Sequence, residues 1–457
     1  MVPDSKKKKK RKKPTPQRHR WFDHWLIANG DPLKRLVSEV INAVDTEERR
    51  EKARRRARRA QDHRYHLDRI EAVVANLAYS VLNPPETGRL AVNTRNGERG
   101  RTRYENPALG KPFSPLLHLL QDIGLLSIKR PEVRRGEMQG VAPTPSFNRI
   151  VVEQGIDLSS FGRHRAEEVI LLTRNTRGLN GENGVTRERI DYSDTQTTRR
   201  LRQAMRRLNA FLAAADISFV DDGKLPLVDP FERTLRRHFV LLAEQNDTRF
   251  DQSGRLFGGF WQNMKSDRRN GIRINGEPTV TLDYGSMFTR LAYAEIKATP
   301  PQGDLYAVPG LESYRSGVKM AMNCLLFDTS LKRRRWPSEM GIGVGSDDDA
   351  KRPRTEAALY EARLPEGSTV RKTKESILRL HPQLRPAWGR GLGYKLMHME
   401  SWILMSVLEE LVRRDIPALG LHDGLLVAAS QSQVADSVMR DVALNLTGHR
   451  IPVAEKN

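Results

Sequence analysis

Two aspartates near the C-terminal end of the chain, Asp283 and Asp423, stand in contexts that suit metal-dependent phosphoryl transfer. Asp283 follows TVTL (279–282), and this β-branched and apolar run predicts a strand that ends at the carboxylate. Asp423 lies in IPALGLHDGLLVAA (416–429), where apolar residues flank a polar centre, which predicts a tight β-hairpin with the carboxylate at its tip. Two aspartates on neighbouring strands can hold two Mg²⁺ ions about 3.5–4 Å apart, with the Tyr284 carbonyl as a further oxygen ligand.

A predicted helix between these two segments supplies positive charge. Arg315, Lys319, Asn323 and Phe327 recur every four residues, so they form a slanted stripe on one helix face. The two cations can bind phosphates, and the aromatic ring can stack on a base or sugar. Taken alone, the segments favour ordinary structural interpretations: a strand-end turn, a polar hairpin and a surface helix with a core aromatic. Taken together, they favour a site for nucleotidyl transfer.

In this order, the three segments resemble the motifs of family A DNA polymerases and of single-subunit phage RNA polymerases. The family pattern is Asp-Tyr-Ser with a later Arg, then a helix with Arg, Lys and an aromatic residue, then His-Asp. The matching residues are Asp283, Tyr284, Arg290, Arg315, Lys319, Phe327, His422 and Asp423. Upstream, SGRLFGGFWQN (253–263) is similar to the segment before the first motif. GDLYAVPG (303–310) is similar to a later segment, with Tyr306 in place of a His.

The resemblance implies a role for each position. The catalytic residues would be Asp283, Asp423 and His422, and the metal ligands would be Asp283, Tyr284 and Asp423. Nucleotide binding would use Arg315, Lys319, Phe327, Phe288 and Tyr306. Template or primer binding would use Arg255, Gln262, Asn263 and Arg290. The implied cofactor is a pair of Mg²⁺ ions, which Mn²⁺ can replace, and the implied activity is that of a DNA polymerase or primase-polymerase of a mobile element.

Several positions depart from the family pattern. Phe288 stands where the DNA enzymes have a Glu that blocks a 2′-hydroxyl, Asn323 replaces an aromatic residue, and Gly424 replaces a Glu. Gly285 replaces the Ser of the first motif. Because Phe288 can exclude ribose by its bulk, we expect a preference for dNTP over rNTP. Whether synthesis needs a primer or a small accessory subunit stays open.

The composition favours a nucleic-acid partner. The chain has 457 residues, a formal net charge of +22 and a pI near 10.2, and so large a basic excess suits a polyanion. We therefore expect DNA as template or primer-template. No run of about 18 apolar residues exists, so we expect no membrane partner. A single cysteine, Cys324, fits a reducing cytoplasm, with nucleoid association in a bacterial host.

The fold class we expect is α+β: a right-hand polymerase-like palm with helical fingers, after a mostly helical basic N-terminal region. The predicted divisions are a disordered basic arm (1–20), a basic helical region (21–152), a helical thumb-like region (153–250), and palm and fingers (251–457, fingers about 305–400). The lysine-rich arm fits DNA binding and a nuclear localisation signal equally well.

Local patterns refine these divisions. In the first region, FSPLLHLLQDIGLLSIKR (113–130) predicts a helix that ends at Gly124 and continues into a strand, and NRIVVE (148–153) predicts another strand. This order fits a winged-helix element and an ordinary helix–strand unit equally well. In the second region, 195–217 and PFERTLRRHFVLLAEQ (230–245) predict amphipathic helices.

A second interpretation remains open for the whole chain. It is a catalytically inactive DNA-binding protein for replication initiation or scaffolding, with a polymerase-like palm and its basic N-terminal segments as the functional part. The two interpretations share nucleic-acid binding and differ in whether Asp283 and Asp423 hold metal.

Overall fold

A computed structural model of the chain describes residues 20–50, 57–93, 102–129, 139–177, 185–242, 248–334, 336, 364–365 and 367–456. The fold is α+β, as the sequence predicts, and it divides into two compact units, residues 1–167 and 168–457. The predicted arm falls almost wholly on residues 1–19, outside the described residues. Among the described helices, none is long and apolar enough to cross a membrane.

Unit 1 is built around the buried helix α2. Its helices are α1 (Asp31–Arg50), α2 (Ala60–Leu82), α3 (Phe113–Asp122) and α4 (Pro145–Glu153). One sheet has the order β1 (Arg20–Trp21), β3 (Leu90–Ala91), β5 (Gly140–Pro143), β4 (Leu126–Lys129). A two-stranded sheet pairs β2 (Leu26–Ala28) with β6 (Phe161–Arg163). Ile70, Val73 and Leu77 of α2 are fully or almost fully buried in the core of this unit.

The predicted helix-to-strand passage at Gly124 is confirmed, because α3 ends before a glycine with φ of 79° and β4 follows. The predicted strand over 148–153 is wrong. That segment is α4, whose first turn is capped by the Thr144 hydroxyl, which accepts from the Phe147 amide at 3.3 Å. The strand that pairs with β4 is β5 instead. β4 follows α3 and runs antiparallel to β5, and the winged-helix element itself stays a prediction.

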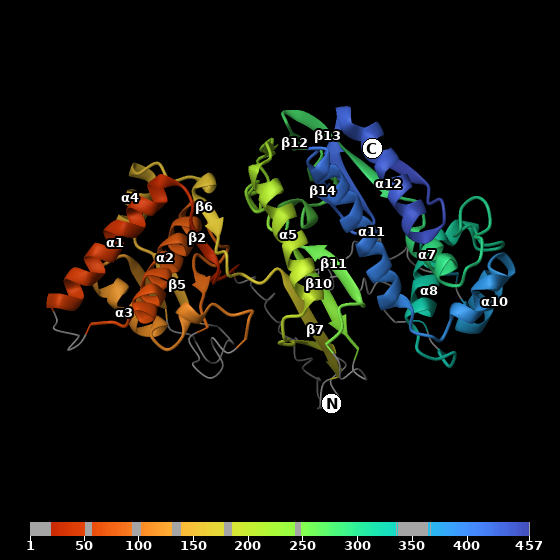
Figure 1. Cartoon of the computed structure of the whole chain (residues 1–457), viewed down its shortest axis with the longest axis horizontal. Coiled ribbons are helices and arrows are strands. Elements are labelled where there is room, and N and C mark those ends of the chain that lie inside the picture. The colour runs from red at the N-terminus through yellow and green to blue at the C-terminus, as the bar shows by residue number, and fades with distance from the viewer. Residues whose placement is uncertain are drawn as a thin grey trace, which may run out of the picture. The chain divides into compact units, whose positions relative to one another are not determined.

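Unit 2 contains two sheets (Figure 1). The first has the order β11 (Ser253–Phe257), β10 (Arg236–Leu241), β7 (Ile170–Arg177), β8 (Val185–Arg189). The six-stranded sheet has the order β14 (Ala418–Gly420), β15 (Gly424–Ala428), β13 (Glu277–Tyr284), β12 (Ile272–Ile274), β9 (Ile217–Phe219). Its remaining strand, β16 (Val453–Lys456), pairs antiparallel with β13.

The helices of unit 2 are α5 (Gln196–Ala214), α6 (Ser266–Arg269), α7 (Met287–Glu295), α8 (Arg315–Phe327), α10 (Val370–Leu380), α11 (Gly393–Arg413) and α12 (Ser432–Thr447). The long helix α11 packs on β11 and beside α12 (Figure 1). Leu404, Leu408 and Leu411 of α11 are buried, which accounts for its tight packing.

The predicted organisation of 153–250 as a helical region is wrong in part. α5 is the helix that the arginine-rich segment predicts, but 230–245 contains the strand β10 instead of a helix. Phe239 and Leu241 are fully buried within a strand that lies between β7 and β11. The boundary between the units also falls after Glu167, later than the predicted boundary at 152.

Candidate active site

The two predicted catalytic aspartates lie on adjacent strands of the six-stranded sheet. Asp283 on β13 pairs directly with Gly424 on β15, and the Tyr284 amide donates to the Asp423 carbonyl at 2.9 Å. The Leu421 amide donates to the Gly424 carbonyl at 2.8 Å, which closes the turn that carries Asp423. The strand and the hairpin that the sequence predicts are therefore present, and the strand register places the backbone of Asp423 beside that of Asp283 and Tyr284.

Gly424 is at this position because the backbone of β15 passes very close to Asp283. A Cβ at Gly424 would lie 2.0 Å from the Asp283 Oδ1 and 2.4 Å from the Leu282 carbonyl oxygen. No side chain fits there without displacing the aspartate. The departure from the family pattern at Gly424 thus has a steric cause, namely the close packing of β15 on β13.

The carboxylate of Asp283 has two different environments. Asp283 is 7% exposed. Its Oδ1 is buried and has no hydrogen-bond partner in the described structure, whereas its Oδ2 forms an ion pair with Lys456 of β16. A buried acceptor without a partner costs free energy, so Oδ1 is suited to an incoming donor or cation. Lys456 was not a predicted site residue, and its position depends on the pairing of β16 with β13.

The donor set agrees with the chemistry of Mg²⁺. This ion takes hard oxygen ligands, and it is usually held by one or two carboxylates together with substrate phosphates and water. Asp283 and Asp423 supply two carboxylates, of which Asp423 is half-buried. Among the described residues, neither aspartate belongs to a group of three or more His, Cys, Asp or Glu side chains whose ligand atoms lie within 4.8 Å of one another. A triad of that size, Asp45, Glu48 and His66, lies in unit 1, where Arg58 Nη2 contacts Glu48 at 2.6 Å.

His422 is a neutral side chain at physiological pH. Burial, together with the smaller effect of the charges of Arg255 and Arg269, lowers the pKa of His422 to about 3. Its ring packs edge-on against Phe257, with centroids 5.1 Å apart, and its Nδ1 is buried without a partner in the described structure. His422 is thus equipped to hydrogen-bond a phosphate or a primer terminus, whereas an imidazolium–phosphate ion pair is disfavoured.

Glu400 of α11 is a buried acid beside this site. It is 3% exposed and forms an ion pair with Arg255, whose Nη2 lies 2.6 Å from Glu400 Oε2. Burial raises the pKa of Glu400 to about 7; Arg255 and Lys319 oppose this rise and Asp423 adds to it. Arg255, a predicted template contact, is thus held in place by an internal carboxylate. The sequence signal for Glu400 is an acid within the apolar run LMHMESWILM (396–405).

The helix predicted to carry Arg315 and Lys319 is confirmed as α8, while its binding of phosphates stays a prediction, and its two cations have different surroundings. Arg315 donates from Nε to Asp304 Oδ2 at 2.5 Å and lies over the ring of Tyr306, 5.1 Å from its centroid. Hydrogen bonding to Asp304 raises the pKa of Arg315. Lys319, one helical turn further, is exposed. Tyr306 is 1% exposed, so a nucleotide could contact its ring only if the ring were uncovered. In the present structure, Tyr306 could act on a nucleotide only through its contact with Arg315.

Phe288 of α7 and Phe327 of α8 are brought together in space. Their rings stack with centroids 5.8 Å apart and an interplanar angle of 12°, and Tyr394 of α11 packs edge-on against Phe327 at 5.3 Å. A Cβ at Gly393 would lie 2.2 Å from the Phe327 ring, so glycine is required beside it. The two predicted nucleotide-binding aromatics therefore form one cluster, and each ring has one face covered by the other.

The predicted template and primer residues divide by exposure. Gln262 donates to the carbonyls of Leu256 and Gly420 at 3.2 and 3.0 Å, so its amide supports the backbone. Asn263 beside it is exposed. Arg290 donates from Nε to the Gly285 carbonyl at 3.1 Å, which closes the turn after β13.

Tyr284, the remaining predicted metal ligand, has a buried side chain. Its hydroxyl donates to the Met439 carbonyl of α12 at 2.6 Å, so the phenol anchors β13 to that helix. A metal contact by its backbone carbonyl stays a prediction.

No protein-family model matches the chain, and no curated protein matches it in sequence.

Proposed function

We propose that the chain is a template-directed nucleotidyltransferase, a DNA polymerase or primase-polymerase that uses a pair of Mg²⁺ ions held by Asp283 and Asp423. The observation that carries the proposal is the strand register that pairs Asp283 with Gly424 and sets Asp423 beside it. Bound Mg²⁺ would favour ionisation of the attacking 3′-hydroxyl and neutralise the triphosphate. The unpartnered Oδ1 of Asp283 supports this assignment, since it is an oxygen donor ready for a cation.

The cations of α8 would bind the triphosphate. Lys319 is exposed and one turn from Arg315, so the two can contact neighbouring phosphates. Arg315 is already oriented by Asp304, which leaves the guanidinium held in one direction before a nucleotide arrives. The Phe288–Phe327 stack would form an apolar wall for the base or sugar, and its bulk supports the expected dNTP preference.

The test is nucleotide incorporation by the purified chain on primed and unprimed single strands, with dNTP and rNTP compared side by side. Asp283→Asn and Asp423→Asn should each reduce incorporation by at least a thousandfold and leave DNA binding nearly unchanged, because neither change removes a positive charge. A matched control is Asp441→Asn, which alters an exposed acid of α12. Incorporation that survives both substitutions would refute the proposal, and equal rates with both sugars would refute the dNTP preference.

A second candidate, a DNA-binding protein without catalysis, is favoured by one observation. Lys456 places an ammonium group on Asp283 Oδ2, at the carboxylate that would hold metal. If the chain only binds DNA, the unaltered protein should incorporate neither dNTP nor rNTP on primed or unprimed single strands. The Lys456→Gln variant should show no incorporation either.

A further inference from the structure

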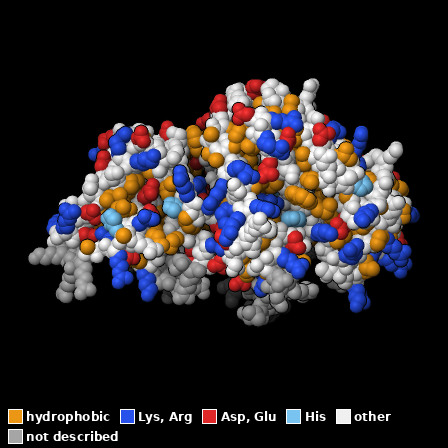
Figure 2. Space-filling model, viewed as in Figure 1, with side chains coloured by type: hydrophobic (Ala, Val, Ile, Leu, Met, Phe, Trp, Pro, Cys, Tyr) orange, Lys and Arg blue, Asp and Glu red, His pale blue; other side chains and the backbone are white. Residues whose placement is uncertain are grey.

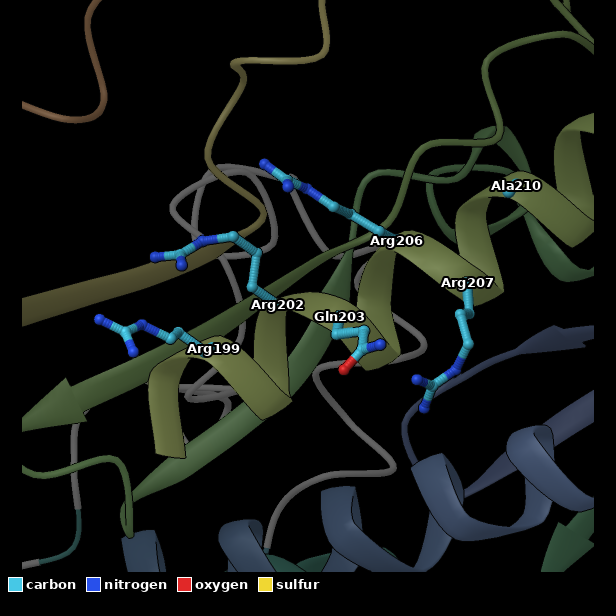
Figure 3. A pocket seen from close by; sticks show the side chains of 6 residues that line it. All are labelled: Arg199, Arg202, Gln203, Arg206, Arg207 and Ala210. Carbon is cyan, nitrogen blue, oxygen red and sulfur yellow. The ribbon is translucent and has the colours of Figure 1, made fainter. Parts of the chain in front are cut away.

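α5 presents a row of arginines on its exposed side. The helix carries five arginines and no acidic residue in 19 residues. Four of them, together with Gln203 and Ala210, line an open pocket of about 510 Å³: Arg199, Arg202, Arg206 and Arg207. Arg199, Arg202 and Arg206 extend to one side of the helix, and Arg207 extends to another (Figure 3). We call Arg199, Arg202 and Arg206 the arginine row.

The orientation of the row is set by the opposite face of α5. Met205, Leu208 and Leu212 are buried at helical spacing, so the helix cannot rotate without exposing them. A capping box fixes the start of the helix: the Thr198 amide donates to the Thr195 hydroxyl, and the Thr195 amide donates to the Thr198 hydroxyl. The exposed arginines are therefore displayed from a rigid helix.

The middle arginine is held by carboxylates, and its neighbours are exposed. Arg202 Nη2 lies 3.0 Å from Glu168 and 2.9 Å from Asp194. Burial disfavours its charge, but the hydrogen bonds that Arg202 donates to these two acids outweigh that effect and raise the pKa of Arg202. Arg199 and Arg206, one turn before and one turn after, are exposed. The row thus combines one guanidinium that two carboxylates hold with two exposed arginines.

Other helices of the chain show what a solvated charged face looks like. In α12, Arg440 pairs with Asp436 at 2.6 Å, and in α10, Arg371 pairs with Glu375 at 3.3 Å, both within their own helix. α5 contains no acid, so its arginines can pair only with acids of other elements, as Arg207 does with Glu409 at 3.5 Å. Lys and Arg side chains gather on the face of the molecule over α5 (Figure 2). Neighbouring guanidiniums repel one another, so a helix that carries five arginines and no acid favours an anionic ligand on its exposed face.

We propose that the arginine row binds the sugar-phosphate backbone of a nucleic-acid strand. With a rise of about 1.5 Å per residue, the row extends about 10 Å along the helix, and successive phosphates of one duplex strand advance about 3.4 Å. The row therefore spans several phosphates of one strand. Guanidinium groups suit phosphate oxygens because they donate two parallel hydrogen bonds. The inference rests on the proposed function for its ligand, because the row would give the same nucleic acid a second contact. Binding at the row does not require catalysis.

The test measures binding of a fluorescein-labelled 20-nucleotide single strand by anisotropy over a range of salt concentrations, without nucleotide or Mg²⁺. Arg199→Gln/Arg206→Gln should weaken binding about tenfold and reduce the slope of log K against log salt by about 1.4, because two phosphate contacts are lost. The control, Arg371→Gln/Arg413→Gln, removes the same charge from arginines whose side chains are 88% and 72% exposed, and it should change both quantities little. Unfolding temperatures should stay equal, since all four side chains are exposed.

Two results would overturn the proposal. One is an unchanged affinity or an equal loss in both double variants, which would assign binding to net charge alone. The other is binding of polyglutamate as tight as that of the oligonucleotide and equally sensitive to Arg199→Gln/Arg206→Gln, which would assign the surface to an acidic protein. The result is independent of the catalytic proposal, because Asp283→Asn should abolish incorporation and leave this binding intact.

Discussion

The Asp283–Asp423 site and the arginine row of α5 are constructed in opposite ways. The aspartates are 140 residues apart in the chain (423 − 283) and meet through the register of buried strands. The row lies within one helix, over eight residues, and Arg199 and Arg206 at its ends are exposed. The first arrangement is fixed by strand pairing, while the second presents long side chains on the exposed face of one helix.

The two arrangements suit two different kinds of function, chemistry at a carboxylate pair and binding to a nucleic-acid backbone. Chemistry at a carboxylate pair needs fixed distances, which close packing supplies. Binding to a uniform backbone needs charge at a repeating spacing, which a single amphipathic helix supplies. Small changes at the buried site should therefore have large effects, and changes in the row should have graded effects.

The largest effect is expected for Gly424→Ala, which adds one methyl group between β15 and Asp283. Because this carbon would lie 2.0 Å from Asp283 Oδ1, the strands must separate, and we expect a loss of about 2–3 kcal/mol in the free energy of unfolding. Incorporation should fall at least a hundredfold. Denaturant unfolding and primer extension measure the two quantities.

The matched control is Gly110→Ala, where the nearest atom to an added Cβ is 3.7 Å away. This variant should unfold within about 0.5 kcal/mol of the unaltered chain. Equal stability of the two variants would contradict the close packing of β15 on Asp283.

A smaller effect is expected from the pH dependence of Glu400. Burial raises its folded-state pKa to about 7 from an ordinary value of 4.5, so the folded state binds the proton more tightly than the unfolded chain. Glu400 thus contributes on the order of 2 kcal/mol to the free energy of unfolding below pH 4.5, and this contribution is lost as the pH rises through about 7. Urea unfolding between pH 4.5 and 8 should show this fall, and Glu400→Gln should remove it. A pH slope unchanged in Glu400→Gln would disprove this.

The smallest effect is expected for Lys456→Gln, which removes the ammonium group from Asp283. We expect Mn²⁺, used as a paramagnetic probe for Mg²⁺, to bind about fivefold more tightly by electron paramagnetic resonance, because a competing cation is lost. Lys395→Gln is the control, since Lys395 forms a similar ion pair with Glu295 at 2.6 Å. An Mn²⁺ affinity equal in the two variants would show that Lys456 does not oppose metal.

Much of the fold followed from local patterns. The strand before Asp283 and the hairpin around Asp423 were predicted from apolar and β-branched runs, and the helix with Arg315 and Lys319 from helical spacing; all three are present. Two predictions failed for identifiable reasons. The β-branched run in 148–153 looked like a strand, but Thr144 caps a helix there. The run in 230–245 looked helical, but β10 is enclosed by strands on both sides.

By itself, the sequence determined the chemistry available in each segment: carboxylates at strand ends, cations at helical spacing and arginines opposite an apolar face. These features depend on neighbours a few residues away, which the chain order states directly. Only the tertiary structure decided that Lys456 contacts Asp283, that Glu400 is buried beside Arg255, and that Gly424 leaves no room for a side chain. Each of these depends on which distant strands pair and in which register, because a shift of one residue turns every side chain to the other face of the sheet.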